Sequence, residues 1–288
     1  MRDNNGFISL EKLDIQNFKN MKKRRLYSFK YNGDIYFYKV IYDVDKLYNE
    51  LVGEKIAKRM NIPCAHYDLA SYYDTVGVIS KNIFSEDDIY ISMEEILQNY
   101  FSYGVDINAK NNLEDIWSAI SSRYKAWNKN VEINLINELI NIFIFDILIA
   151  NSDRHTENYG ICENKNNIHF AKLIDNENML SPISIITGGY SIGIDENDIF
   201  YNEDEISLED NFVRKFLNYS SSEYRELISN RLSIISEANI KEIFDEIEND
   251  IHASMQTQIK RQLMTDFQRN YSMIYRVINE NKIKMLRR

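Results

Sequence analysis

The segment ANSDRHTENYG, residues 150–160, follows directly on the most apolar helix-like stretch of the chain. Its eleven residues include two acids, two amides, an arginine and a histidine. Taken singly, each of these side chains suits a polar loop that caps a helix. Taken together, they indicate a site that acts on a charged ligand.

Three oxygen-bearing side chains are expected to converge near this segment. Asp153 precedes Asn158 by five residues, and Asp175 ends the apolar, strand-like stretch FAKLID. Carboxylate and amide oxygens are hard ligands that suit Mg²⁺, which takes few protein ligands and binds phosphate oxygens as well. Protein kinases place an Asp, an Asn five residues later and a further Asp around a nucleotide in this way. The spacing therefore predicts phosphoryl transfer.

A site of this kind also needs a cation on a neighbouring sheet, steadied by a carboxylate from a helix. Lys39 lies in the middle of the aromatic, strand-like run DIYFYKVIY, and the helix predicted after it offers Glu50 and Glu54, one turn apart. The alternative for Lys39 is an edge-strand lysine that blunts pairing between sheets. The alternative for both glutamates is a solvated helix face.

With these residues in place, the chain resembles a known family. The motifs NSDRHTENYG and LIDNE resemble those of the HipA-like kinases and, more distantly, of the phosphatidylinositol 3/4-kinases, whose catalytic loops carry Asp-Arg-His-x-x-Asn. The apolar stretch FIFDILIAN and the earlier stretch from YKVIYD to GVIS are similar to shorter HipA-like proteins. The resemblance covers roughly residues 20–180.

This resemblance implies a kinase that uses ATP and Mg²⁺. By it, Asp153 is the catalytic aspartate, and Asn158 and Asp175 bind magnesium. Lys39 contacts the α- and β-phosphates, and Glu50 is its ion-pair partner.

No Gly-rich phosphate loop precedes the first predicted hairpin. The corresponding segment, NFKNMKKRR, offers Lys22, Lys23 and Arg24, whose side chains would contact the phosphates instead. Asp175 is followed by Asn-Glu, where ordinary protein kinases have Phe-Gly.

Three further polar residues around the motif are expected to support it. Arg154 and His155 would organise the loop rather than do chemistry. Asp146, surrounded by apolar neighbours in FIFDILIAN, must find hydrogen-bond donors if it is buried. The backbone of the catalytic loop is the expected source.

The first third of the chain reads mainly as strands. Residues 24–42 form two aromatic-rich runs joined by Asn32-Gly33, which is the strongest short hairpin signal. A helix is predicted over residues 43–62, followed by a second antiparallel strand pair.

From about residue 90 the pattern changes to helices, with one hairpin over residues 160–175 and amphipathic helices from about residue 207 onward. We therefore predict an α+β, two-lobed protein-kinase-like fold. A small β-rich N-lobe would span residues 1–85, and a large helical C-lobe with the catalytic loop would span residues 86–288.

Composition limits the partners and the setting. The net charge of −10 argues against bulk affinity for nucleic acid or anionic membranes. The two cysteines, Cys64 and Cys162, form no paired metal or redox motif, which favours a reduced, cytoplasmic setting. The N-terminus has no apolar signal core, and the longest apolar run is broken by Glu138 and Asp146, so no membrane span is expected.

The sequence thus favours an ATP- and magnesium-dependent kinase that phosphorylates a protein Ser, Thr or Tyr, including its own. The family resemblance adds an antitoxin-like or regulatory protein as a candidate partner. One alternative is a pseudokinase-type module that binds nucleotide without turnover. Another is a lipid or small-molecule kinase, which rests on the Asp-Arg-His order alone.

Overall fold

The structure is a computed structural model that describes most residues up to 176 and from 237 onward. The described residues are 2–21, 25–101, 104–105, 107, 113–125, 129–149, 151, 154–165, 167–176, 179, 229–230, 232–233, 235 and 237–286.

A six-stranded sheet occupies the N-terminal part of the chain, in the order β1-β5-β6-β4-β3-β2. Its strands are β1 (Ile8–Ser9), β2 (Gln16–Asn20), β3 (Leu26–Tyr31), β4 (Asp34–Val40), β5 (Tyr67–Tyr72) and β6 (Thr75–Lys81). Only the β1–β5 pair is parallel. Asn32 and Gly33 join β3 to β4, and both have positive φ (50° and 86°). Two such residues form a turn whose twist matches the flanking strands, which confirms the predicted hairpin.

The two faces of this sheet have different roles. Side chains alternate along a strand, so Tyr38 and Val40 of β4 face an aromatic-rich core that the short 3-10 helix η1 (Leu10–Lys12) helps to cover. The opposite face, which carries Lys39, packs against α1 (Val44–Arg59). The sheet therefore holds Lys39 on the face that is covered by α1, the helix between β4 and β5 in the chain.

The rest of the described chain is mainly helical. A three-stranded sheet, β7 (Ile89–Ser92), β8 (Gly160–Glu163) and β9 (Ile168–Phe170), packs beside α2 (Met93–Tyr100), α3 (Leu113–Tyr124) and α4 (Lys129–Leu148). The side chain of Ser92 caps α2 by accepting from the Glu95 backbone N–H at 3.1 Å. Leu135, Leu139 and Phe145 of α4 are fully buried, as expected for the central helix of a lobe.

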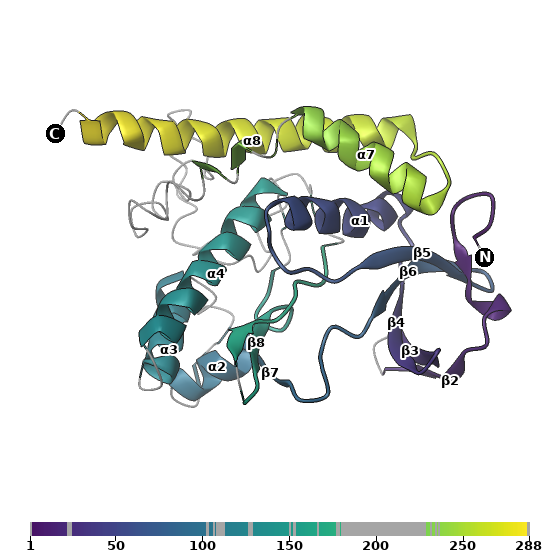
Figure 1. Ribbon diagram of the computed structural model, residues 1–288, viewed down its shortest axis with the longest axis horizontal. Coiled ribbons are helices and arrows are strands. Elements are labelled where there is room, and N and C mark those ends of the chain that lie inside the picture. The colour runs from purple at the N-terminus through teal and green to yellow at the C-terminus, as the bar shows by residue number, and fades with distance from the viewer. Residues whose placement is uncertain are drawn as a thin grey trace.

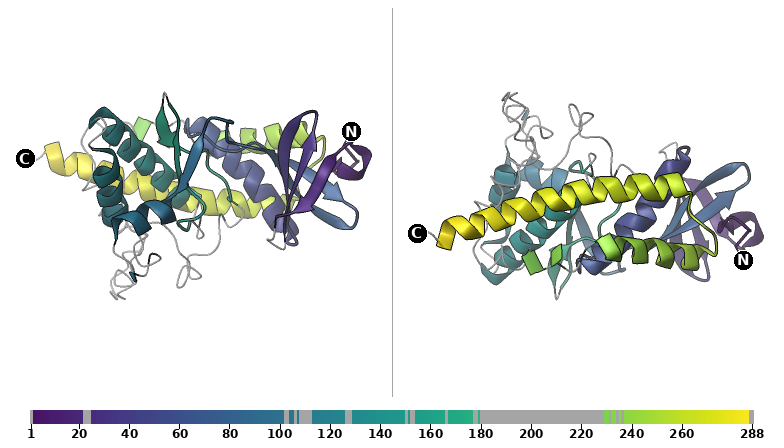
Figure 2. Two further views of the ribbon diagram at one scale, coloured as in Figure 1. Left: turned by 90° about the horizontal axis from the view of Figure 1, so that it is seen from below. Right: turned by 90° about the horizontal axis from the view of Figure 1, so that it is seen from above.

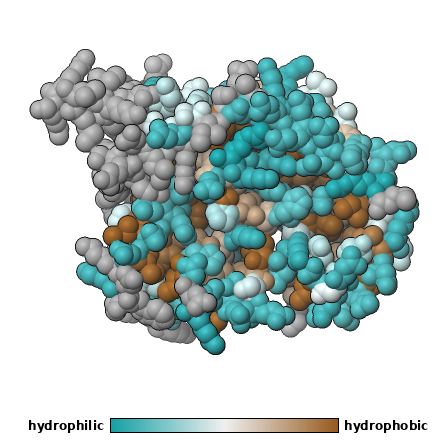
Figure 3. Space-filling model, viewed as in Figure 1, coloured by the Kyte–Doolittle hydropathy of each residue, from teal (hydrophilic) through white to brown (hydrophobic). Residues whose placement is uncertain are grey.

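The last two described helices bridge the two parts of the molecule. These are α7 (Glu237–Ile251) and α8 (Thr257–Leu286). Figures 1 and 2 show α7 lying over α1, while α8 runs on across the helical part and past α4. Figure 3 shows that hydrophilic residues gather over α7 on this side of the molecule. Within the described part of the chain, no helix combines the length and apolarity that a membrane span needs.

This architecture confirms the predicted α+β, two-lobed kinase-like fold. Strands β1, β2 and β7 were not expected, because two to five residues are too few for a clear period-2 signal. The lobe boundary at residues 85 and 86 stays a prediction, and the helix expected from residue 207 lies outside the described residues.

Candidate active site

Lys39 connects three separate segments of the chain. Its Nζ donates to Glu50 Oε1 of α1 at 3.1 Å and makes a short ion pair with Asp175 Oδ1, which follows β9. Its strand, β4, lies between β3 and β6. The edge-strand interpretation of Lys39 is therefore wrong, because a central strand has no free edge to blunt.

Glu50 is fully buried and uses both carboxylate oxygens. One oxygen receives Lys39, and the other accepts the Asn176 backbone N–H at 2.8 Å. Burial raises the pKa of Glu50, and the Lys39 ammonium offsets part of that rise. The carboxylate thus fixes α1 to both the sheet and the segment after β9.

Asp175 has a left-handed backbone, with φ of 65°. This conformation is uncommon for residues other than glycine and is concentrated at functional sites. The Asp175 N–H donates to the Tyr67 hydroxyl at 3.3 Å. Burial alone would raise the pKa of Asp175, but Lys39, with weaker help from Arg154 and His155, holds it below its usual value. The carboxylate is therefore kept ionised.

Arg154 is the largest of the fully buried side chains and sits at the centre of a second network. Its Nε and Nη2 donate to the two oxygens of Asp146 at 3.0 and 2.9 Å. Its Nη1 donates to the Ile174 carbonyl at 2.6 Å, and Nη2 also donates to Asn176 Oδ1 at 3.0 Å. Burial would lower the pKa of Arg154, but Asp146 raises it, so the guanidinium stays charged.

This network corrects the expectation for Asp146. Its carboxylate oxygens receive side-chain donors, Arg154 and the Asn151 Nδ2 at 3.1 Å, rather than the loop backbone. Guanidinium matches a carboxylate with two parallel hydrogen bonds, which single backbone N–H groups do not. Arg154 therefore ties the end of α4 to the segment that carries Asp175.

Asn176 joins the two networks. Its side chain accepts from Arg154, and its backbone N–H donates to Glu50. A Cβ atom at Gly53 would lie only 3.0 Å from the Asn176 side chain, so α1 approaches this residue closely. The chain of contacts runs unbroken from Asp146 to Lys39.

A cavity of about 510 Å³ opens beside Lys39 and Asp175. Its charged end also carries Asn158, His155 and Glu157. Its apolar wall is formed by residues from both parts of the chain: Leu26, Phe37, Val78, Ile83, Phe84 and Ile174. Pockets with mostly apolar walls and a few convergent polar groups are the usual form of small-molecule sites.

Solved structures of other proteins share this architecture. The Helicobacter pylori proinflammatory kinase CtkA matches with a TM-score of 0.69 and 18% sequence identity, over 96% of this chain and 99% of that chain. The chain has the HipA-like kinase fold. HipA of Shewanella oneidensis MR-1, in its complex with HipB and operator DNA, matches with a TM-score of 0.52 and 14% identity, over 92% of this chain and 65% of that chain. Neither a protein-family model nor a curated protein sequence matches the chain.

Within this HipA-like fold, the structure brings Lys39, Asp175 and Asn158 to one cavity. Glu50 does not line the cavity and is buried behind it, where it pairs with Lys39. The buried Asn158 is held in the loop by its backbone N–H, which donates to the His155 carbonyl at 3.0 Å. Asp175 and Asn158 line the same cavity. A carboxylate and an amide oxygen are a donor set that suits Mg²⁺, with phosphate oxygens completing its shell.

Four predicted residues lie outside the described part of the chain: Asp153, Lys22, Lys23 and Arg24. Arg25, the next residue in the same basic run, lines the cavity. His155 also lines it, so its place is at the cavity and not only in the loop.

Glu54 is not on a solvated face. It is buried, and one of its carboxylate oxygens accepts a hydrogen bond from the Tyr67 backbone N–H at 2.9 Å. The other carboxylate oxygen lies 2.7 Å from His66 Nδ1. Asn176 and Tyr67 were missed as site residues. The sequence did offer one sign of the role of Asn176: Asp175 is followed by Asn-Glu, where ordinary protein kinases have Phe-Gly.

Proposed function

We propose that this protein is a kinase that binds ATP and Mg²⁺ in the 510 Å³ cavity and transfers the γ-phosphoryl group to a protein hydroxyl, of another chain or its own. The observation that carries the proposal is the position of Lys39. It pairs with Glu50 and Asp175 and lines a cavity that has both apolar and polar walls. Phosphoryl transfer depends on positioning and charge neutralisation, and these residues supply both.

Each part of the cavity has a place in this proposal. The apolar wall, which includes Leu26, Phe37 and Ile174, would hold the purine base. Lys39 would face the phosphates, and Asp175 and Asn158 would hold Mg²⁺. The metal would neutralise charge on the phosphate oxygens. Asp153 would orient the acceptor hydroxyl and take its proton.

Lys39 and Asp175 form an ion pair, so each offsets the charge of the other. A polyphosphate that approaches Lys39 also meets the Asp175 carboxylate, and this repulsion is removed only when a cation is present. We therefore expect nucleotide and metal to bind together.

ATP with Mg²⁺ is expected to raise the melting temperature, because a ligand that binds only the folded state stabilises it by mass action, by about 2.7 kcal/mol at a concentration 100 times its dissociation constant. ATP with a chelator should give a smaller shift. The shift is measured by differential scanning fluorimetry, and transfer by incubation with γ-labelled ATP and a cell lysate.

A shift together with labelled protein supports the enzyme. A shift without product in any lysate favours the pseudokinase-type module, and labelled lipid or small molecules would favour the remaining alternative. The absence of any shift would contradict all three.

Lys39→Met and Glu50→Gln are each expected to lower phosphoryl transfer by roughly tenfold or more, since each removes part of one charge arrangement. The double variant should be little worse than the more damaged single variant, because two residues that act as a unit are non-additive. Initial rates with γ-labelled ATP measure this. Lys30→Met, an exposed lysine on β3, is the matched control and should keep the parental rate. Additive losses in the double variant would contradict a shared role.

A further inference from the structure

Two rows of opposite charge face one another where α7 lies on α1. Glu242, Glu246 and Asp250 follow at four-residue steps along α7, so they share one face. Lys55 and Arg59 are spaced in the same way on α1. This pattern was not visible in the sequence, because the two rows are more than 180 residues apart.

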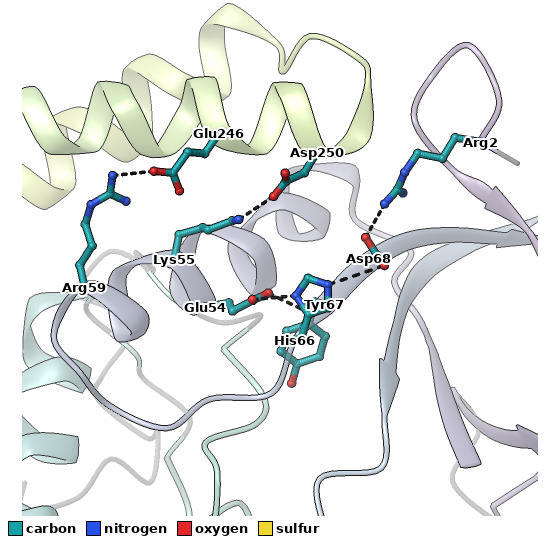
Figure 4. Close-up of polar contacts among 9 residues, drawn as sticks. All are labelled: Arg2, Glu54, Lys55, Arg59, His66, Tyr67, Asp68, Glu246 and Asp250. Carbon is teal, nitrogen blue, oxygen red and sulfur yellow. Dashed lines mark hydrogen bonds and ion pairs between the residues drawn. The ribbon is translucent and has the colours of Figure 1, made fainter. Parts of the chain in front are cut away.

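The rows are joined by direct ion pairs (Figure 4). Lys55 Nζ lies 2.6 Å from Asp250 Oδ2, and Arg59 Nη2 lies 2.8 Å from Glu246 Oε1. The Lys55 and Arg59 side chains are only 14% and 19% exposed, so the cations are largely enclosed while the acids remain open to solvent. Ion pairs of this kind add little to stability on their own, but they determine which faces of two helices meet.

The ion pairs lie on the side of α1 that faces away from the active site. With 3.6 residues per turn, Lys55 and Arg59 are roughly 140° and 180° around the helix from Glu50. One turn after Glu50 and on nearly the same face, Glu54 fixes α1 to the start of β5 through the Tyr67 N–H (Figure 4). The helix is therefore held by α7 on one side and by Lys39 on the other.

The second C-terminal helix anchors this arrangement to the large lobe. Lys260 of α8 pairs with Glu248 of α7 at 2.6 Å. Further along α8, Asn270 Nδ2 donates to the Leu148 carbonyl at 3.2 Å, at the end of α4 and just before the catalytic loop. The hairpin α7–α8 thus contacts both the helix that carries Glu50 and the helix that leads into the loop.

We propose that Lys55 and Arg59 are positioning residues: through Asp250 and Glu246, they let the α7–α8 hairpin hold α1 where Glu50 reaches Lys39. This inference rests on the proposed kinase function. It makes the C-terminal helices part of the machinery that sets the rate of transfer, although none of their residues lines the described cavity.

The test is a charge swap. In the double variant Lys55→Glu/Arg59→Glu, like charges face each other across the helices, and we expect kcat to fall at least tenfold with a smaller change in the KM for ATP. The reverse pair Glu246→Arg/Asp250→Lys should behave alike. Combining all four changes restores opposite charges in the two closest pairs, Lys55–Asp250 and Arg59–Glu246, and should recover most of kcat. Lys58→Glu, on an exposed side of α1, should leave the rate unchanged.

A second measurement does not depend on catalysis. Amide hydrogen exchange in α1 should become faster in each charge-reversed variant and return toward the parental rate in the swapped protein. The inference would be overturned if the quadruple variant were as inactive as the double variants. It would also be overturned if the charge-reversed double variants kept the parental kcat. If the parent itself transfers no phosphate, the proposed function fails, and hydrogen exchange alone decides whether α7 holds α1.

Discussion

Replacing Asp175 with asparagine is expected to reduce phosphoryl transfer by ~10²-fold or more while the protein remains folded. The substitution keeps the shape of the side chain and removes its charge. That charge would hold the metal, and it is kept ionised by Lys39, which lowers the pKa of Asp175. Lys39 retains Glu50 as a partner in the variant, so the ion pair between these two residues remains when the one with Asp175 is lost.

Initial rates with γ-labelled ATP and a thermal melt measure the two effects separately. Asp14→Asn, an exposed aspartate in the N-terminal part, is the matched control and should match the parent in both. Parental activity in Asp175→Asn, with a melting temperature close to the parent's, would remove Asp175 from the metal site. A variant that fails to fold would show instead that Asp175 is mainly structural.

The candidate site could be proposed from the sequence where the chemistry needs few residue types at fixed spacing. The spacing of Asp153, Asn158 and Asp175 predicted where the site would be. Lys39 was noticed because it is a lysine among aromatic residues. Choosing Glu50 over Glu54 required a resemblance, because residues one helical turn apart share a face. The structure separates them by their partners: Lys39 and Asn176 for Glu50, His66 and Tyr67 for Glu54.

The supporting networks could not be predicted in the same way. Arginine is almost never fully buried unless it is paired, so a loop role was the natural expectation for Arg154. Its burial depends on Asp146, Ile174 and Asn176 meeting in space, which no local period encodes. The ion pairs between α1 and α7 could not be predicted for the same reason, since Lys55 and Asp250 meet in space but are 195 residues apart in the sequence.

Arg154→Met is expected to cost about 3–5 kcal/mol of unfolding free energy, because it leaves the Asp146 carboxylate buried without its charged partner. A natural domain has only about 5–15 kcal/mol in total, so the variant should melt far below the parent. Arg154→Lys should rescue little, since an ammonium group cannot reproduce the planar fork that reaches Asp146, Ile174 and Asn176.

A double-mutant cycle isolates the cause of this loss. Asp146→Asn removes the unpaired charge, so Arg154→Met/Asp146→Asn should be more stable than Arg154→Met alone.

The matched control is Arg123→Met, because the Arg123 side chain also pairs with a carboxylate, Glu163 at 3.0 Å, but is 33% exposed. Partly exposed pairs contribute about 0–1 kcal/mol, so this control should melt near the parent. Urea unfolding curves give the four free energies. If Arg154→Met unfolds within ~1 kcal/mol of the parent, or if Asp146→Asn brings no recovery, the buried guanidinium does not hold the loop, and Asn176 must be positioned by its other contacts, such as Glu50.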